Sequence, residues 1–262
     1  MPRPRRRLLG PAAQHRGFAS VRLTRAGLGW ALMVRHVFFD FFGTLVDYDP
    51  STHPAYNAPL AFARRAGSAI SPEAVNEHWQ NTWDALESEA GRTGREYSMH
   101  QVAQRYWAAI GSPPVSGDAI DTLIEEYLDA WAGNVRPAAA ALDCVTDLAV
   151  DHRLTIVSNT HAPALVPRLV HRFGLNSAVD MIITSVEVGW RKPHPKIFEA
   201  ALHARGTTAA DVVFVGDNWA ADVEGPRRLG MPSIYVGGPE PARASTALTE
   251  LPRIIRSLPA PP

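Results

Sequence analysis

Lysine is nearly absent from this sequence. Of the 26 basic residues in the 262-residue chain, only Lys192 and Lys196 are lysines, and the rest are arginines. Any chemical step that needs an ammonium group therefore has two candidate residues. The formal net charge is zero, so bulk electrostatics favour neither nucleic acid nor an anionic membrane surface as a partner.

Cysteine and long apolar runs are also scarce. Cys144 is the single cysteine, so no internal disulfide can form, and its apolar helical setting favours a buried spectator over a nucleophile. No apolar run approaches the roughly 18 residues that a membrane-spanning helix needs. Without a secretory signal or a disulfide pair, we expect a cytoplasmic protein with no membrane partner. The sequence does not indicate an oligomeric state.

Residues 1–32 differ from the rest of the chain because they contain seven arginines and no acidic residue. Targeting peptides can have this composition, but the long apolar core of a secretory signal is missing. Met33 stands just before the first apolar run. We therefore expect a disordered extension or a misplaced start, with a basic interaction arm as the alternative.

Five short apolar runs rich in β-formers punctuate the sequence. Each has five or six residues without strict alternation, which is typical of strands buried on both faces of a parallel sheet. Helix-length segments separate the last four runs, and strand–helix alternation predicts a doubly wound α/β fold. The runs are residues 36–41, 154–159, 180–185, 212–217 and 232–236.

The long interval after the first run contains no comparable strand. Residues 49–137 show four amphipathic helical patterns instead, and Ser71 followed by Pro72 is a good helix start. We therefore expect an all-helical cap inserted into a Rossmann-like core. The core comprises residues 33–48 and 138–250, and residues 251–262 form a tail that begins with a short helix.

Polar residues stand at or shortly after the ends of the predicted strands. In an open parallel sheet, ligands bind at the carboxyl ends of the strands. Three carboxylates gathered there would repel one another, whereas a divalent cation would neutralise them while lysine and hydroxyl groups hold an anion. The residues concerned are Asp40, Ser158, Asn159, Lys192, Asp217 and Asp222.

Four sequence motifs occur in order at these strand ends. The sequence resembles the haloacid dehalogenase superfamily of hydrolases, which is mostly phosphatases, and its subfamily with a helical cap between the first and second motifs. The resemblance covers about residues 36–240. The motifs are DFFGT at 40–44, LTIVSNT at 154–160, the lysine of GWRKPHPKIF at 189–198, and VGDNWAADVEGPRRLGM at 215–231.

The resemblance implies a role for each motif. Asp40 would be the nucleophile that forms a covalent aspartyl intermediate, Ser158 would hydrogen-bond the transferring group, and Lys192 would neutralise the developing charge. A simple turn at Ser158 and Asn159, or a surface position for Lys192, is the structural alternative. The residues assigned to substrate binding and support of the loop are Gly43, Thr44 and Asn159.

The resemblance also implies a Mg²⁺ site. Asp40, the backbone carbonyl of Phe42 and Asp217 would bind the ion, and oxygen ligands suit Mg²⁺ better than a softer metal. Asp222 would orient the metal's surroundings or Lys192, with a solvated helix position as the alternative.

Phe42 departs from the pattern of the phosphatases that the sequence resembles. Those enzymes carry an aspartate two residues after the nucleophile, which protonates the leaving group, and phenylalanine cannot transfer a proton. General acid–base assistance is worth about 10²- to 10⁴-fold. We therefore expect ordinary alkyl phosphates to be slow substrates.

Three precedents from the superfamily bear on Phe42, and the third is a phosphatase whose substrate has a weakly basic leaving group or whose cap supplies the acid. Phosphonate-cleaving members use a lysine of the cap, and this cap has none, so we reject that chemistry. Haloacid dehalogenases place an aromatic residue at this position and lack the metal, but the two aspartates of the fourth motif, Asp217 and Asp222, favour a retained cation. We therefore expect a Mg²⁺-dependent phosphatase acting on a small phosphorylated metabolite. A dehalogenase is the alternative, followed by a catalytically weak phosphate-binding relative.

The cap offers further candidates for substrate contact. If another residue supplies the missing proton, His53 is the first to test, because it lies in the linker that enters the cap. We expect most of the tryptophans at positions 79, 83 and 107 to serve helix packing. The other polar candidates are His78, His100, Arg92 and Arg95.

Overall fold

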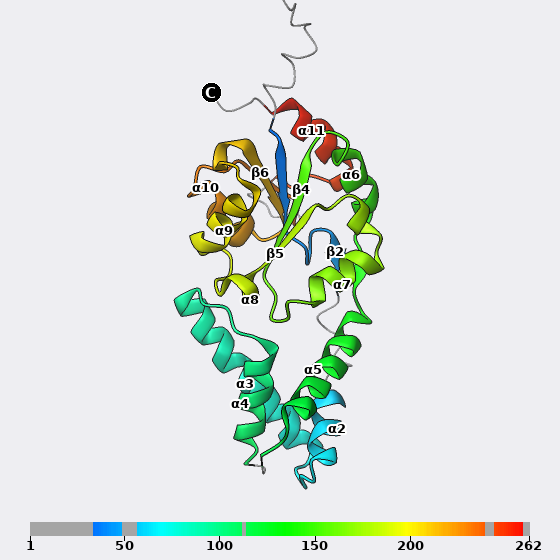
Figure 1. Cartoon of the computed structure of the whole chain (residues 1–262), viewed down its shortest axis with the longest axis vertical. Coiled ribbons are helices and arrows are strands. Elements are labelled where there is room, and N and C mark those ends of the chain that lie inside the picture. Colours follow the sequence, from blue (N-terminus) through cyan, green and yellow to red (C-terminus); the bar gives the residue numbers. More distant parts are fainter. Residues whose placement is uncertain (1–33, 49–56, 112–113, 239–243, 259–262) are drawn as a thin grey trace, which may run out of the picture. The chain divides into compact units, whose positions relative to one another are not determined.

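The structure is a computed structural model that describes residues 34–48, 57–111, 114–238 and 244–258 (Figure 1). The predictions for residues 1–32 and for His53 lie outside the described residues. Within them, no helix is long and apolar enough to cross a membrane.

A five-stranded parallel sheet forms the centre of the α/β part. The strand order is β5-β4-β1-β6-β7, so the first strand of the chain lies in the middle of the sheet. All five predicted strands are confirmed, with ends within two residues of those expected. They are β1 (His36–Phe39), β4 (Arg153–Ser158), β5 (Met181–Thr184), β6 (Val212–Gly216) and β7 (Ser233–Tyr235).

Helices cover both faces of this sheet, as the absence of strict alternation predicted (Figure 1). Val37 and Phe39 of β1 face one hydrophobic cluster, and Phe38 faces the other. The first cluster includes side chains of α6 (Ala141–Leu148), α7 (Leu165–Arg172) and α11 (Leu251–Ser257). The second includes side chains of α9 (Pro195–Arg205). The shorter helical elements are η3 (Leu175–Ser177), α8 (Ser185–Val188), η4 (Ala209–Asp211), η5 (Trp219–Glu224), α10 (Gly225–Arg227) and η6 (Leu248–Glu250).

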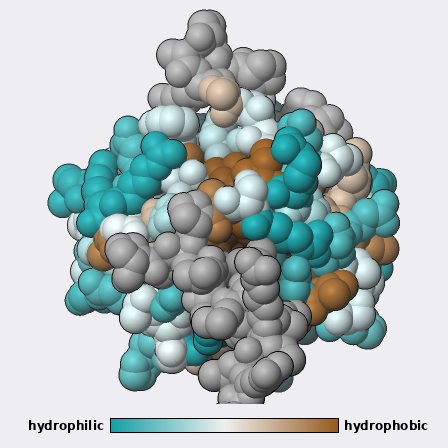
Figure 2. All heavy atoms as spheres, turned by 90° about the horizontal axis from the view of Figure 1, so that it is seen from above, coloured by the Kyte–Doolittle hydropathy of each residue, from teal (hydrophilic) through white to brown (hydrophobic). Residues whose placement is uncertain are grey.

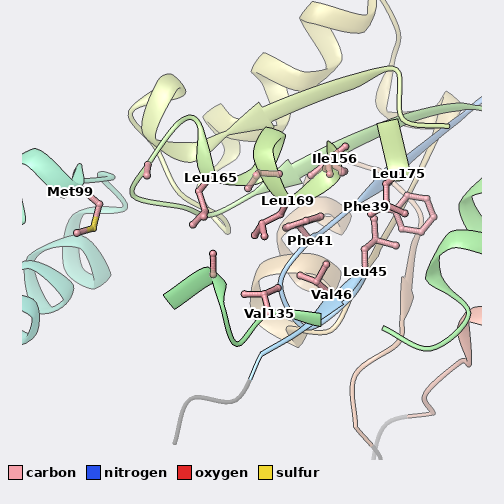
Figure 3. Packing of buried hydrophobic residues seen from close by; sticks show 14 of the residues in the cluster. Phe39, Phe41, Leu45, Val46, Met99, Val135, Ile156, Leu165, Leu169 and Leu175 are labelled. Atoms are coloured by element: carbon pink, nitrogen blue, oxygen red, sulfur yellow. The ribbon is translucent and has the colours of Figure 1, made fainter. Parts of the chain in front are cut away.

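The residues that follow β1 are anchored in the first cluster. Figure 3 shows Phe41, Leu45 and Val46 among side chains such as Leu169 and Ile156, and all five are completely buried. Burying one large apolar side chain stabilises the fold by about 1.5–3 kcal/mol. The turn that carries the polar residues of the first motif is therefore fixed by apolar side chains on both sides of it.

The inserted cap is all-helical, as predicted. Its helices are α2 (Asn57–Arg65), α3 (Pro72–Thr93), α4 (Met99–Ala109) and α5 (Gly117–Ala132). Ser71 caps α3 by accepting a hydrogen bond from the backbone N–H of Ala74, with Pro72 in the first turn, so the predicted helix start is confirmed. Ser98 and Gln101 form a reciprocal capping box at α4.

A two-stranded ribbon that the sequence analysis did not anticipate joins the entry and exit of the cap. β2 (Val46–Asp47) pairs antiparallel with β3 (Arg136–Pro137), so the segments before and after the cap lie side by side. Cys144 is buried within α6, and burial raises the pKa of its thiol to about 12, which confirms the spectator position. Figure 2 shows one face, on which hydrophilic residues surround a hydrophobic area.

Candidate active site

Asp40 follows directly after the central strand and is 7% exposed. Its backbone N–H donates to the carbonyl of Val215 on β6, which fixes the start of the turn. Gly43 follows with φ of +86°, and a Cβ atom there would lie 2.3 Å from Oδ2 of Asp217. Glycine is therefore required both by the backbone conformation and by the close approach of this carboxylate. The N–H of Gly43 donates to the carbonyl of Val46, so it is used inside the turn.

Lys192 lies between two carboxylates. Its Nζ atom donates to Oδ1 of Asp40 at 2.6 Å and to Oδ1 of Asp222 at 2.7 Å, and all three side chains are at least 90% buried. Asn159 holds the backbone of Lys192 from the neighbouring strand end. Its Oδ1 atom accepts from the Lys192 N–H at 2.8 Å, and its Nδ2 atom donates to the Lys192 carbonyl at 3.1 Å. The surface alternative for Lys192 is therefore wrong.

Asp222 lies in η5, a single π-helical stretch, and is completely buried. Its Oδ2 atom accepts from the backbone N–H of Asn218 at 2.9 Å, so both oxygens are engaged and the solvated alternative is wrong. Burial raises the pKa of Asp222 to about 6, although the charge of Lys192 acts in the opposite direction. Burial likewise raises the pKa of Asp40 against the attraction of Lys192.

Three carboxylates converge at this edge of the sheet. Asp40, Asp217 and Asp222 each place an oxygen atom within 4.8 Å of the other two. Thr44, which is 2% exposed, donates its hydroxyl hydrogen to Oδ1 of Asp217 at 3.0 Å and so orients that side chain. Three acidic groups face a single ammonium group, and the donor atoms are all oxygens. This donor set fits Mg²⁺, which favours carboxylate oxygens and would balance the excess negative charge.

The backbone carbonyl of Phe42 offers a further oxygen in the same turn as Asp40. Among the described residues, backbone N–H groups of this turn donate to the carbonyls of Phe41 and Val46, and none donates to that of Phe42. The ring of Phe42 is half-buried and packs edge-on against Trp131 of α5, with 5.3 Å between ring centroids, and against Tyr48 at 6.2 Å. No group on this side chain can donate or accept a proton.

The structure brings most of the predicted residues to one cavity of about 600 Å³. Ser158, Gly43 and Thr44 do not line it. Ser158 is completely buried at the end of β4, where its hydroxyl lies 3.3 Å from the Asn159 carbonyl. The predicted residues that do line the cavity are Asp40, Phe42, Asn159, Lys192, Asp217 and Asp222.

The order of the motifs, the parallel sheet and the inserted helices together indicate one superfamily. Residues 34–230 match the sequence profile of the haloacid dehalogenase-like hydrolases. The chain belongs to this family. The resemblance predicted from the four motifs is thereby confirmed, and the protein is a haloacid dehalogenase-like hydrolase with an α/β core.

The chain is similar to a curated phosphatase and to two solved structures. Ribulose-1,5-bisphosphate 5-phosphatase of Halopiger xanaduensis is 26% identical over 216 residues, which cover 81% of this chain and 89% of that protein. A 2-haloacid dehalogenase of Pseudomonas syringae has a similar structure, with a TM-score of 0.64 and 22% identity, over 85% of this chain and 98% of that one. The structure of a phosphatase of Thermococcus onnurineus has a TM-score of 0.58 and 22% identity, over 84% of this chain and 97% of that one. At these identities the two structures show a shared fold.

The cap supplies the aromatic wall of the cavity in this haloacid dehalogenase-like hydrolase. Trp79 and Trp83 of α3 both line it, whereas Trp107 packs against Phe62 and does not. Trp79 is completely buried and belongs to the helix packing as expected. Tyr127 and Trp131 of α5 also line the cavity and were not among the predicted residues. Their spacing of four residues on a helix was the available signal.

A second polar cluster between the cap and the core was also missed. Glu96 is completely buried as a side chain, and its oxygens lie 3.0 Å from Arg191, 2.5 Å from the Ser185 hydroxyl and 3.2 Å from Nδ1 of His161. Arg191 also pairs with Glu87 at 2.7 Å. Among the predicted cap residues, His100 pairs with an exposed aspartate, and Arg95 stacks over Trp190, 4.0 Å from the ring centroid. The described cavity-lining residues include neither of these two, nor His78 and Arg92.

Proposed function

We propose that this hydrolase is a Mg²⁺-dependent phosphatase that acts on a small phosphorylated metabolite through a covalent aspartyl intermediate. The observation that carries the proposal is the arrangement of Lys192 between Asp40 and Asp222, with Asp217 beside them. The names of curated relatives support it, because they include phosphatases of ribulose 1,5-bisphosphate, glyceraldehyde 3-phosphate and phosphoglycolate.

In the first step, the Asp40 carboxylate attacks phosphorus and the bond from phosphorus to the leaving oxygen breaks. The leaving group departs with the bonding electron pair. In the second step, water adds to phosphorus and Asp40 leaves as a carboxylate, which gives inorganic phosphate. Lys192, held by Asp222 and Asn159, stabilises the negative charge of the transferring group, and a fixed charge in a dry site does this without reorganisation.

Mg²⁺ would be held by Asp40, Asp217 and the Phe42 carbonyl, and it would supply charge neutralisation for the phosphoryl oxygens. Asp222 has both oxygens occupied by Lys192 and Asn218, which favours positioning Lys192 over binding the ion. In the same way, both the oxygen and the nitrogen of the Asn159 amide bind the backbone of Lys192. We therefore assign Asn159 to positioning Lys192 beside the substrate.

The test is phosphate release from acetyl phosphate and from glycerol phosphate, each with Mg²⁺ and with EDTA. Acetyl phosphate has a weakly basic leaving group, so we expect Mg²⁺-dependent turnover of it and slow turnover of glycerol phosphate. Asp40→Asn removes the nucleophile and should abolish release from both. Equal turnover with Mg²⁺ and with EDTA, or unchanged turnover by Asp40→Asn, would contradict the proposal.

Dehalogenation of a 2-haloacid is the second candidate, and the aromatic ring of Phe42 at the cavity favours it. Halide needs no proton to leave, so that chemistry would tolerate phenylalanine at this position. The distinguishing measurement is halide release from chloro-, bromo- and fluoroacetate in EDTA. Release there, together with no phosphate from acetyl phosphate, would place dehalogenation first.

A further inference from the structure

Aromatic side chains form a large part of the cavity lining. Rings from three segments of the chain contribute to it: the turn after β1, helix α3 and helix α5. The ring centroids of Trp79 and Tyr127 lie 5.0 Å apart, and those of Trp83 and Tyr127 lie 6.3 Å apart in a stacked arrangement. The aromatic residues that line the cavity are Phe42, Tyr48, Trp79, Trp83, Tyr127 and Trp131.

Two hydrogen-bond donors on this wall lack an acceptor. The Nε1 atoms of Trp79 and Trp83 are both buried, and neither has a hydrogen-bond partner among the described residues. Buried indole N–H groups usually find a partner, and leaving one without an acceptor costs about 1–3 kcal/mol. Because both nitrogen atoms are closed to solvent, these two residues present ring carbons to the cavity.

Each basic side chain among the described residues that line the cavity is already paired with carboxylates, since Lys192 contacts Asp40 and Asp222 and His161 lies 3.2 Å from Glu96. Among the described residues that line it, Lys192 is the only lysine, and no arginine is present. Arg191 is turned to Glu87 and Glu96. Asp84 also lines the cavity, and its exposed carboxylate accepts a hydrogen bond from the uncharged side chain of Gln80. A substrate with a carboxylate or second phosphate on its leaving group would therefore meet repulsion.

The leaving group must also depart without a proton from residue 42. Phenylalanine there cannot donate one, so a leaving oxygen of low basicity is favoured. A phenol-type oxygen meets this requirement and brings a ring that suits the aromatic wall, because aromatic pairs gain about 0.5–1.5 kcal/mol beyond their area burial.

On the basis of the proposed phosphatase activity, we propose that the substrate is a phosphate monoester of an aromatic hydroxyl group, with no further negative charge on the ring. Asp40 takes the phosphoryl group, the bond between phosphorus and the aryl oxygen breaks, and the phenolate leaves with the electron pair and takes a proton from water. The ring lies against Trp83, Tyr127 and Trp131.

The experiment separates the ring from the basicity of the leaving group. Phenyl phosphate is compared with an alkyl phosphate whose fluorinated alcohol is about as acidic as phenol, and with phosphoglycolate as the doubly anionic substrate. We expect kcat/KM for phenyl phosphate to exceed that for the fluoroalkyl ester by about tenfold, as one aromatic contact provides. Phosphoglycolate should be the slowest. Equal values for the phenyl and fluoroalkyl esters would overturn the inference while leaving the phosphatase proposal intact.

Variants of the wall provide the second measurement. Trp83→Leu and Trp131→Leu should each lower the ratio of phenyl to fluoroalkyl turnover by about fivefold to tenfold. Asp84→Arg should raise phosphoglycolate turnover relative to phenyl phosphate. Glu125→Arg is the matched control, since Glu125 is exposed on α5 and does not line the cavity, and it should leave both ratios unchanged. An unchanged phenyl-to-fluoroalkyl ratio in both tryptophan variants would contradict the assigned wall.

Binding to the Asp40→Asn variant keeps the inference testable apart from turnover. Calorimetry should show phenyl phosphate binding about tenfold more tightly than the fluoroalkyl ester. Failure of every ester to release phosphate from the unmodified protein with Mg²⁺ would reject the phosphatase proposal. Failure of the binding preference alone would reject only the aromatic leaving group.

Discussion

Lys192 and Asp40 form a buried ion pair, with 2.6 Å between Nζ and Oδ1. The lysine is shared with Asp222 at 2.7 Å, so three charges are held in one dry cluster. Removing one partner of a buried pair leaves the others uncompensated and costs about 3–5 kcal/mol. We therefore expect Lys192→Met to lower the free energy of unfolding by about this amount in urea denaturation and to abolish phosphate release.

Lys196 provides the matched control, because it is the second lysine of the chain and is exposed on α9. Lys196→Met should lower the free energy of unfolding by at most about 1 kcal/mol, because its ammonium group lies 4.4 Å from the centroid of the Trp190 ring, and it should leave turnover unchanged. Similar losses of stability in the two variants would contradict the central position assigned to Lys192.

Thr44 controls the orientation of Asp217 through its hydroxyl group. Thr44→Val keeps the shape of the side chain but removes the donor. Groups that orient a metal ligand typically contribute about 10- to 100-fold in metal affinity. We expect Mg²⁺ binding measured by calorimetry to weaken by at least about tenfold, and Thr44→Ser to restore most of it. Equal Mg²⁺ affinity in Thr44→Val and the unmodified protein would exclude Asp217 as a ligand oriented by Thr44.

Phe42 determines which leaving groups are tolerated. Phe42→Asp places a proton donor two residues after Asp40, so turnover of glycerol phosphate should rise relative to acetyl phosphate by about 10². Loss of the ring's packing against Trp131 should also lower stability by about 1–3 kcal/mol. Phe42→Asn is the control, since it removes the same ring without adding an acid. The same rise in both variants would show that the space taken by the ring, and not the missing proton donor, limits turnover of the alkyl ester.

The sheet could be predicted from sequence because its strands are short apolar runs, each between helix-length segments. The residues of the site follow those runs, so Asp40, Asp217 and Lys192 could be placed at one edge before any geometry was known. The residue types and their order after the strands were enough to predict this placement, because parallel strands all have their carboxyl ends at the same edge of the sheet.

The cap–core contacts could not be predicted in the same way. Glu96 and Arg191 are 95 residues apart, and only Arg191 lies within a motif segment. A charged residue in a cap gives no sign of whether it will be buried. The detailed use of Asn159 was also inaccessible, because a strand-end amide can serve a substrate or a neighbouring backbone. Tertiary packing decides both cases.

Glu96 gives the cap–core contact a defined dependence on pH. Burial alone would raise the pKa of Glu96, but hydrogen bonding to His161 and the charges of His161 and Arg191 outweigh burial, so the pKa lies below its ordinary value of 4.5. A carboxyl group whose pKa is lowered by folding stabilises the folded state fully above its unfolded pKa. This contribution is lost as pH falls through the folded pKa.

We therefore expect Glu96→Gln to lower the free energy of unfolding by about 2 kcal/mol at pH 7, as loss of hydrogen bonds to a charged group does. The gap to the unmodified protein should narrow below pH 4.5, because protonation of Glu96 then removes from the unmodified protein the charge that the variant already lacks. Urea denaturation between pH 3.5 and 7 measures this difference in the free energy of unfolding. Glu89→Gln is the control, because Glu89 forms an exposed pair with Arg105, and its stability should follow that of the unmodified protein throughout. A gap for Glu96→Gln that stays constant across this pH range would show that the side chain acts through packing and not through its charge.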